Sequence, residues 1–143
     1  MSRPANIQEK TWLRKALLAA TPNDPDLEAA RGQVLIREGK YPEALDLLQK
    51  SVKTRNDNPD AWGGIAFAAS KTHQPELVLE ALAMRSKFAA DSPATYFLWA
   101  TANDNLHRKV QALEYYQLFL KSASGKFPDE EWQARQRIAV LKK

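Results

Sequence analysis

EGKYPEALDLLQKSVKTRNDNPDAWGGIAFA, residues 38–68, is the stretch that decides the fold of this 143-residue chain. It holds two segments with apolar residues at helical spacing, and each segment follows a signal that interrupts a helix. Gly39 suits a turn because glycine adopts a left-handed backbone without steric cost. Pro59, preceded by the polar Asn58, suits the first turn of a helix, where its missing N–H needs no partner. The stretch predicts a helix, a break and a second helix.

Pro59 belongs to a series with a fixed period. Pro25, Pro59 and Pro93 lie 34 residues apart, and Pro128 follows 35 residues later. Other columns share the 34-residue offset: the small residues Gly32, Ala66 and Ala100, the leucines Leu45, Leu79 and Leu113, and the basic residues Lys53, Lys87 and Lys121. Small residues permit close helix approach, leucines fill the space beside them, and charged columns mark a solvated face. The period therefore indicates stacked copies of one helical unit.

Each period has room for two helices. We expect helices at 26–38, 42–55, 60–72, 75–89, 93–106 and 109–123, paired as three hairpins. Apolar residues at helical spacing also predict a helix at 5–20 and another at 129–141. The chain is therefore expected to be all-α, with eight helices.

The pattern resembles the tetratricopeptide repeat, a family with a 34-residue helix-turn-helix unit. Residues 38–52 resemble its turn and second helix, and 59–68 resemble its first helix, with Trp62 and Ile65 at signature positions. The resemblance covers residues 25–126. Three positions depart from the family: Glu28 and Arg31 stand where apolar residues are usual, and Pro75 replaces an aromatic residue.

The resemblance implies a right-handed α-α superhelix of about three hairpins, with an extra N-terminal helix and a C-terminal capping helix. We expect one domain over 1–143, with the N-terminal helix at 5–20, repeats at 25–58, 59–92 and 93–127, and the capping helix at 128–143. Such a stack leaves an extended concave wall.

In the family, that wall is formed mostly by the first helix of each unit, and the matching positions give our candidate peptide-binding residues. They are Gln33, Arg37, Gly63, Phe67, Lys71, Phe97, Thr101 and Asp104. Phe67 and Phe97 are suited to bury an apolar side chain of a ligand, and Arg37 and Lys71 to bind an acidic group. The competing interpretation makes both phenylalanines core residues and both bases solvated helix ends.

Some members of the family grip the acidic C-terminus of chaperones with a clamp of Lys, Asn and Arg. This chain has Ala29, Gln33, Gly64, Ala94 and Leu98 at those positions, so we do not expect that mechanism. A second aromatic group, Tyr115, Tyr116, Phe119, Phe127 and Trp132, lies near the C-terminus. We interpret it as core packing between the last hairpin and the capping helix.

The formal net charge of +4 is concentrated at the two ends. Residues 1–24 carry four basic and two acidic side chains, residues 121–143 carry six and three, and the middle is close to neutral. Salt-dependent nucleic-acid binding needs several cations on one face, so nucleic acid is not the partner we expect. A helical-repeat module that binds RNA or an anion stays the alternative, as does a helper domain of a larger assembly.

Catalytic and metal chemistry find little support in the sequence. The chain has no cysteine, and none of the common nucleotide-binding or hydrolase motifs occurs. His73 and His107 are one period apart in the column that begins with Gly39, which makes them turn residues with a left-handed backbone and too far apart for one metal ion. We expect no catalytic residue, no cofactor and no metal.

The hypothesis that follows is a non-catalytic scaffold that binds a protein or peptide in its concave groove. No apolar run is long enough to span a membrane and the N-terminus lacks the apolar core of a secretory signal, so we expect a cytoplasmic protein. A homo-oligomer is a further possibility, because Trp12 at one end and Ile138 and Leu141 at the other would leave apolar surface.

Overall fold

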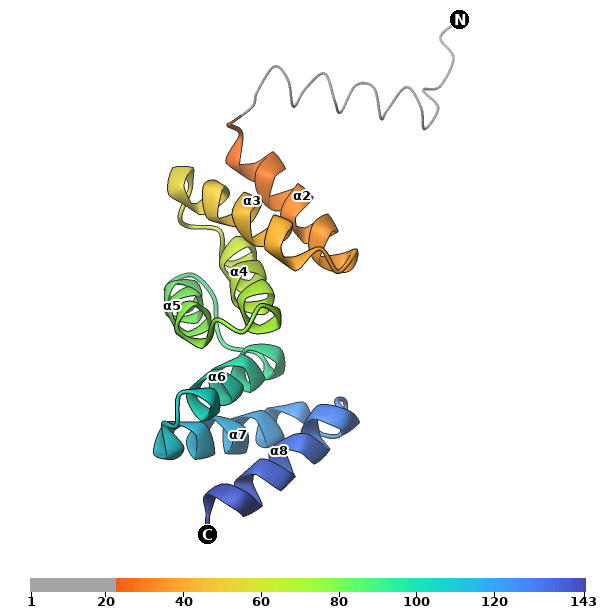
Figure 1. Ribbon diagram of the computed structural model, residues 1–143, viewed down its shortest axis with the longest axis vertical. Helices are drawn as coiled ribbons and strands as arrows, with labels where there is room; N and C mark the ends of the chain where they lie inside the picture. Colours follow the sequence, from red (N-terminus) through yellow and green to blue (C-terminus); the bar gives the residue numbers. More distant parts are fainter. Residues whose placement is uncertain (1–22) are drawn as a thin grey trace, which may run out of the picture.

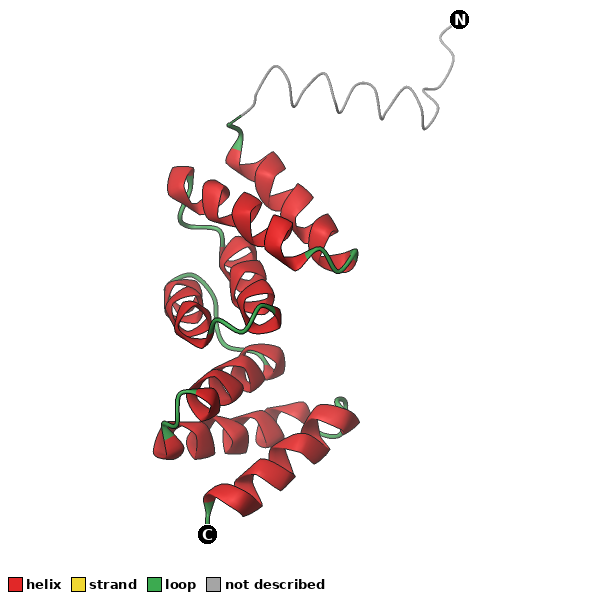
Figure 2. Ribbon diagram, in the orientation of Figure 1, coloured by secondary structure: helices red, strands yellow, loops and turns green. Residues whose placement is uncertain are grey.

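The computed structural model describes residues 23–143, and over this range every regular element is a helix (Figures 1 and 2). The helices are α2 (Pro25–Arg37), α3 (Tyr41–Thr54), α4 (Pro59–Lys71), α5 (Pro75–Ser86), α6 (Pro93–Asn105), α7 (Lys109–Ala123) and α8 (Pro128–Leu141). They match the predicted ranges closely, with one exception at the end of α5. The predicted helix at 5–20 lies outside the described residues.

The helices form a stack of hairpins. α2 pairs with α3, α4 with α5 and α6 with α7, and each hairpin packs on the next through α3 against α4 and α5 against α6. Figure 1 shows the hairpins piled along the long axis of the molecule, with α8 at one end against α7. The first helices also touch in series, α2 with α4 and α4 with α6. The predicted all-α superhelix of repeated hairpins is confirmed.

The first helix of each hairpin is capped by the polar residue that precedes its proline. The Asp24 carboxylate accepts from the backbone N–H of Asp26 at 2.9 Å, and the Asn58 side chain accepts from that of Asp60 at 3.1 Å. Ser92 forms a reciprocal capping box with Thr95. Each such cap contributes about 1 kcal/mol. The prolines therefore mark helix starts, because the side chain before each one accepts a hydrogen bond from an N–H of the first turn that has no partner within the helix.

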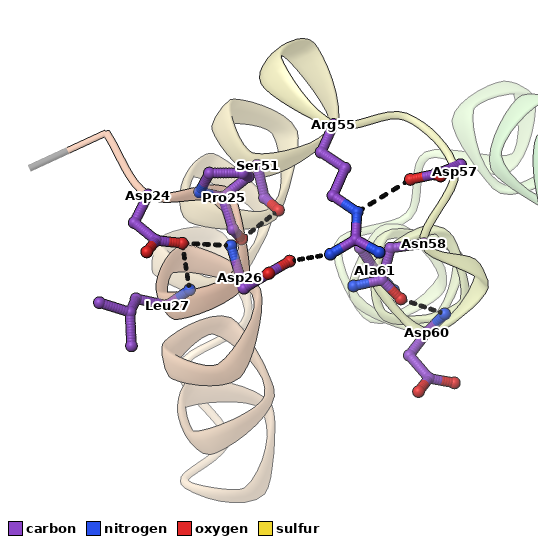
Figure 3. A network of polar contacts seen from close by, with 10 residues as sticks. All are labelled: Asp24, Pro25, Asp26, Leu27, Ser51, Arg55, Asp57, Asn58, Asp60 and Ala61. Carbon is purple, nitrogen blue, oxygen red and sulfur yellow. Dashed lines mark hydrogen bonds and ion pairs between the residues drawn. The ribbon is translucent and has the colours of Figure 1, made fainter. Parts of the chain in front are cut away.

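A polar network at the open end of the first hairpin connects α2, the end of α3 and the loop that leads to α4 (Figure 3). Arg55, just after α3, donates to the carboxylates of Asp57, at 2.9 Å, and of Asp26. The hydrogen bonds to Asp57 and Asp26 raise the pKa of the Arg55 guanidinium. Ser51 donates from its hydroxyl to the Pro25 carbonyl at 2.6 Å, which holds the start of α2 against the end of α3.

The turn between the two helices of each unit has the same backbone in all three units. Gly39, His73 and His107 have φ values of 75°, 59° and 60°, which confirms the predicted left-handed position. The N–H of the next residue then donates to a carbonyl five residues back, from Lys40, Gln74 and Arg108 alike, at 2.9 Å in each case. The two histidines therefore stand where the turn needs a positive φ.

The helix predicted at 75–89 ends earlier, at Ser86. The N–H groups of Lys87 and Phe88 donate to carbonyls three residues back, at Met84 (3.2 Å) and Arg85 (2.9 Å), and the N–H of Ala89 donates to the same Arg85 carbonyl at 3.0 Å. This tightening ends the α-helix and leads the chain into the extended segment before Ser92. The apolar Phe88 and Ala89 extended the predicted helix, but their N–H groups share the Arg85 carbonyl in a closing turn and do not continue the helix.

The core consists of two clusters. The first extends over the helices from α2 to α6 and contains fully buried aliphatic side chains, among them Leu48, Ile65 and Leu82. The second lies between α6, α7 and α8 and is built on the buried rings of Tyr116 and Phe119. The first cluster depends on very close helix approach. A Cβ atom added at Gly32 or Gly64 would lie 2.6 Å or 2.9 Å from atoms of Leu48, so neither position has room for a larger residue.

Candidate interaction surface

One hollow on the first helices lies between α2 and α4. We call it the N-terminal groove, and it has a volume of about 510 Å³. Its lining comes from three helices: Gln33, Ile36 and Arg37 of α2, Pro59, Asp60, Gly63, Gly64 and Phe67 of α4, and Arg85 of α5. Four candidate residues from the sequence, Gln33, Arg37, Gly63 and Phe67, therefore line one groove. A fifth, Lys71, adjoins it, with Nζ 5.4 Å from the centroid of the Phe67 ring.

Phe67 is supported on one side and open on the other. Its ring packs edge-to-face against Tyr41 with centroids 6.0 Å apart, and Lys71 lies over it at cation–π distance. The residue still exposes 36% of its surface. An aromatic ring that is held in place by two neighbours and exposed to solvent offers apolar contact area without further ordering.

The floor of the N-terminal groove is rigid. Gln33 donates from Nε2 to the Asp60 carbonyl at 2.9 Å, which ties α2 to the first turn of α4. A Cβ atom at Gly64 would lie 2.8 Å from the same Nε2 atom, so the small residue is what lets the two helices meet. Gln33 is thus placed as a structural bridge as well as a lining residue.

Arg85 is a groove residue that the sequence did not predict, because it belongs to the second helix of its hairpin. Its guanidinium lies beside Gly63 and donates from Nη1 to the Ala90 carbonyl at 2.9 Å. A signal for it exists in the 34-residue columns. Ser51 and Phe119 stand at the equivalent positions and are almost fully buried. A charged side chain is not buried in this way without a partner, so the arginine in that column is expected at the surface.

The remaining candidate residues lie elsewhere. Phe97 is half-buried in the second cluster, with its ring centroid 5.0 Å from that of Phe119 and 6.4 Å from that of Tyr116. Thr101 and Asp104 line a separate hollow of about 410 Å³ between α6 and α8, which we call the C-terminal groove. It is lined by Thr101, Asp104, Asn105, His107, Tyr116, Gln133 and Arg137. The structure therefore divides the candidates between two grooves and the core.

The charges of the C-terminal groove are already paired. Arg137 of α8 donates to both carboxylate oxygens of Asp104, from Nε at 2.7 Å and from Nη2 at 2.9 Å. Tyr116 of α7 donates its hydroxyl to the same carboxylate at 2.8 Å. The Arg137 hydrogen bonds hold the pKa of Asp104 below its usual range, and burial raises the pKa of Tyr116. In this groove, the Asp104 carboxylate of α6 therefore joins α8 by a salt bridge and α7 by a hydrogen bond.

The C-terminal aromatic residues mostly pack, as predicted. Phe119 lies 6.2 Å from Phe127 between ring centroids, and Tyr115 stacks on Trp99 at 5.1 Å. Trp132 is different, since it keeps 64% of its surface exposed.

The expected apolar end surface is also different in detail. Ile138 and Leu141 are half-buried against the second cluster, so they do not supply it. Trp132 and Val140 are the exposed apolar residues of α8. Of the residues named for a homo-oligomer, the capping helix uses Ile138 and Leu141 for its own packing, and Trp12 lies outside the described residues.

Among residues 23–143, no group of three potential ligands is placed to hold a metal ion. His73 and His107 are both exposed, each on its own turn. No helix in this range is long and apolar enough to cross a membrane.

Comparison with known proteins agrees with this architecture. Residues 35–96 match the tetratricopeptide repeat family. The chain is 36% identical over 73 residues to a TPR repeat-containing protein of Dictyostelium discoideum, an alignment that covers 51% of this chain and 28% of that relative. The chain thus spans much less than two thirds of the relative's length.

Solved structures share the fold at low sequence identity. A crystal structure of MamA protein aligns with a TM-score of 0.75 and 19% identity, covering 90% of this chain and 67% of that one. YrrB, described as a TPR protein with an unusual peptide-binding site, aligns with a TM-score of 0.72 and 12% identity, covering 90% and 63%. The TPR domain of Sgt2 from Aspergillus fumigatus aligns with a TM-score of 0.63 and 17% identity, covering 82% and 76%.

These findings define a helical-repeat fold of stacked hairpins. Residues 35–96 carry tetratricopeptide repeats, which confirms the resemblance found in the sequence.

Proposed function

We propose that this protein is a non-catalytic scaffold that binds a segment of a partner protein in the N-terminal groove. The observation that supports the proposal is the Phe67 ring, which packs against Tyr41 and is also exposed to solvent. It lines a hollow of about 510 Å³ that Arg37 lines as well. A hollow of this size accepts a few side chains of an extended segment.

The composition of the groove favours a peptide over a small metabolite. Its apolar contacts, Ile36 and Phe67, lie on two different helices, and its charged groups are spread along the same two helices and α5. Contacts dispersed in this way suit a chain that runs across the helices. The similarity in fold to YrrB, described as having a peptide-binding site, points in the same direction.

The test is affinity capture from the native cell extract with three forms of the immobilised protein. The first is the unchanged chain, and the second carries Arg37→Glu with Phe67→Asp. The third is a matched control with Arg108→Glu and Val110→Asp, since Arg108 is exposed and Val110 exposes 74% of its surface away from the groove. Circular dichroism confirms that each form is folded.

We expect the unchanged chain and the control to recover the same partner, and the groove variant to lose at least nine tenths of it. Equal recovery by the folded groove variant would show that the partner binds elsewhere. A partner lost equally from the control and the groove variant would contradict the proposal in the same way.

A further inference from the structure

The Gly63 and Arg85 pair gives the N-terminal groove a chemistry that the other hairpins lack. In the third hairpin, Phe97 of α6 and Phe119 of α7 fill the equivalent positions with two packed rings 5.0 Å apart. In the second hairpin, 34 residues earlier, the first helix has a glycine and the second helix an arginine. Here a charged group takes the place of a core contact.

Arg85 reaches the groove by packing along the backbone face of Gly63. A Cβ atom built at Gly63 would lie 3.5 Å from Nε and 3.6 Å from Cδ of Arg85, so the arginine side chain passes directly over the glycine. The hydrogen bond from Nη1 to the Ala90 carbonyl at 2.9 Å holds the guanidinium in that position. Nε and Nη2 remain as donors, because Arg85 makes no salt bridge with any residue from 23 to 143.

The charge of the groove is positive. Arg37 and Arg85 are its two basic lining residues, and Asp60 is its one acidic lining residue. Lys71 adds a third cation beside the Phe67 ring. Neither Arg37 nor Lys71 forms an ion pair in the described part of the chain. A segment with a carboxylate complements these groups, since a guanidinium binds a carboxylate through parallel hydrogen bonds.

We propose that the N-terminal groove binds an extended, acidic protein segment in which a carboxylate lies close to a large apolar side chain, and that Arg85 is the residue that recognises the carboxylate. The apolar side chain contacts Phe67 and Ile36. This inference rests on the proposed function, because it names the partner chemistry of the same groove.

The experiment uses a phage-displayed library of random dodecapeptides, selected on the purified full chain. Enriched peptides are synthesised with a fluorescent label, and their affinities are measured by anisotropy for the unchanged chain and for Phe67→Asp, Arg85→Glu, Arg85→Gln and Arg108→Glu. Arg108→Glu is the matched control, as it reverses one exposed charge outside the groove. Arg85→Gln provides a milder change should Arg85→Glu fail to fold.

We expect the enriched peptides to share an Asp or Glu beside a large apolar residue. Phe67→Asp and Arg85→Glu should each weaken their binding at least tenfold, Arg85→Gln about fivefold, and Arg108→Glu less than twofold. Replacing the shared acidic residue of a peptide by Gln should remove most of the difference between the unchanged chain and Arg85→Gln.

The other outcomes separate the two proposals. If the peptides depend on Phe67 but carry no common acidic residue, or bind Arg85→Gln as well as the unchanged chain, the role of Arg85 is refuted and the groove remains the binding site. If no enriched peptide depends on Phe67, the proposed function and this inference both fail.

Discussion

The N-terminal and C-terminal grooves occupy equivalent places on the first helices and have similar volumes, yet they differ in how their charges are used. In the C-terminal groove, Asp104 and Arg137 satisfy each other and Tyr116. In the N-terminal groove, Arg37 and Arg85 have no acidic partner within residues 23–143. A hollow with internally paired charges stabilises the fold, whereas one with unpaired cations and an open ring is available to a ligand.

The difference arises at single positions of the repeat. Ile36, Ser70 and Asp104 are equivalent residues, 34 apart, and only the last is acidic. One carboxylate at this position gives α8 a partner for Arg137 and turns a potential binding surface into a helix contact. The repeat supplies the same backbone to every unit, and its variable positions decide between binding and packing.

The largest effect is expected from Phe119→Ala. Phe119 is 1% exposed and packs on Phe97 and Phe127, so its removal leaves a cavity in the second cluster. We expect the free energy of unfolding to fall by about 4 kcal/mol, measured by urea denaturation. The matched change in the N-terminal groove, Phe67→Ala, should cost less than about 1 kcal/mol because its ring is partly solvated. Similar losses for both variants would contradict the comparison.

Asp104→Ala should have the next largest effect. The change leaves the buried Tyr116 hydroxyl without an acceptor and frees Arg137 from its bidentate contact. An unsatisfied buried hydroxyl costs about 2 kcal/mol, so urea denaturation should report a loss near that value. Tyr116→Phe in the same background should recover part of it, because the orphaned hydroxyl is then gone. A double variant that is no more stable than Asp104→Ala would exclude this cause.

The Asp104 salt bridge also predicts a dependence on pH. Its hydrogen bonds to Arg137 lower the pKa of the folded carboxyl below the unfolded value of about 4. The stabilisation is therefore complete above that value and is lost as the pH falls through the lower, folded pKa. The stability advantage of the unchanged chain over Asp104→Asn should shrink between pH 5 and pH 2, measured by denaturation at each pH. A constant difference would argue against the salt bridge.

The smallest effects are expected at the turns. Gly39→Ala places a side chain at φ 75° and should cost about 1 kcal/mol, whereas His107→Gly removes one at φ 60° and should stabilise the chain by up to about 1 kcal/mol. Thermal unfolding followed by circular dichroism measures both. If Gly39→Ala lowers the thermal stability and His107→Gly raises it, the same left-handed backbone governs both turns. Equal signs would show that other contacts of the histidine dominate.

The helices of residues 23–143 could be predicted almost completely from the sequence, for physical reasons that act locally. A proline after a capping residue starts a helix, and Gly39 and its equivalents end one. Repetition then reveals the stack. The error at the end of α5 came from Phe88, whose apolar side chain continued the helical pattern into the turn that closes on the Arg85 carbonyl.

Only some of the residues of the candidate interaction surface could be predicted from the sequence. Gln33, Arg37, Gly63 and Phe67 were found because their repeat positions are known to face outward, but the same rule selected Phe97, which packs on Phe119. Arg85 was missed because it reaches the groove through a contact with Gly63 between two helices, and no single helix pattern contains such a contact.

The Asp104 carboxylate has a consequence for how the chain unfolds. In stacked repeats each helix normally contacts its neighbours alone, so the ends open one helix at a time. Here one side chain of α6 binds both α7, through Tyr116, and α8, through Arg137. The last three helices are thereby joined into one cooperative segment. Their amide protons should exchange with solvent at a common rate, while opening at α2 proceeds independently.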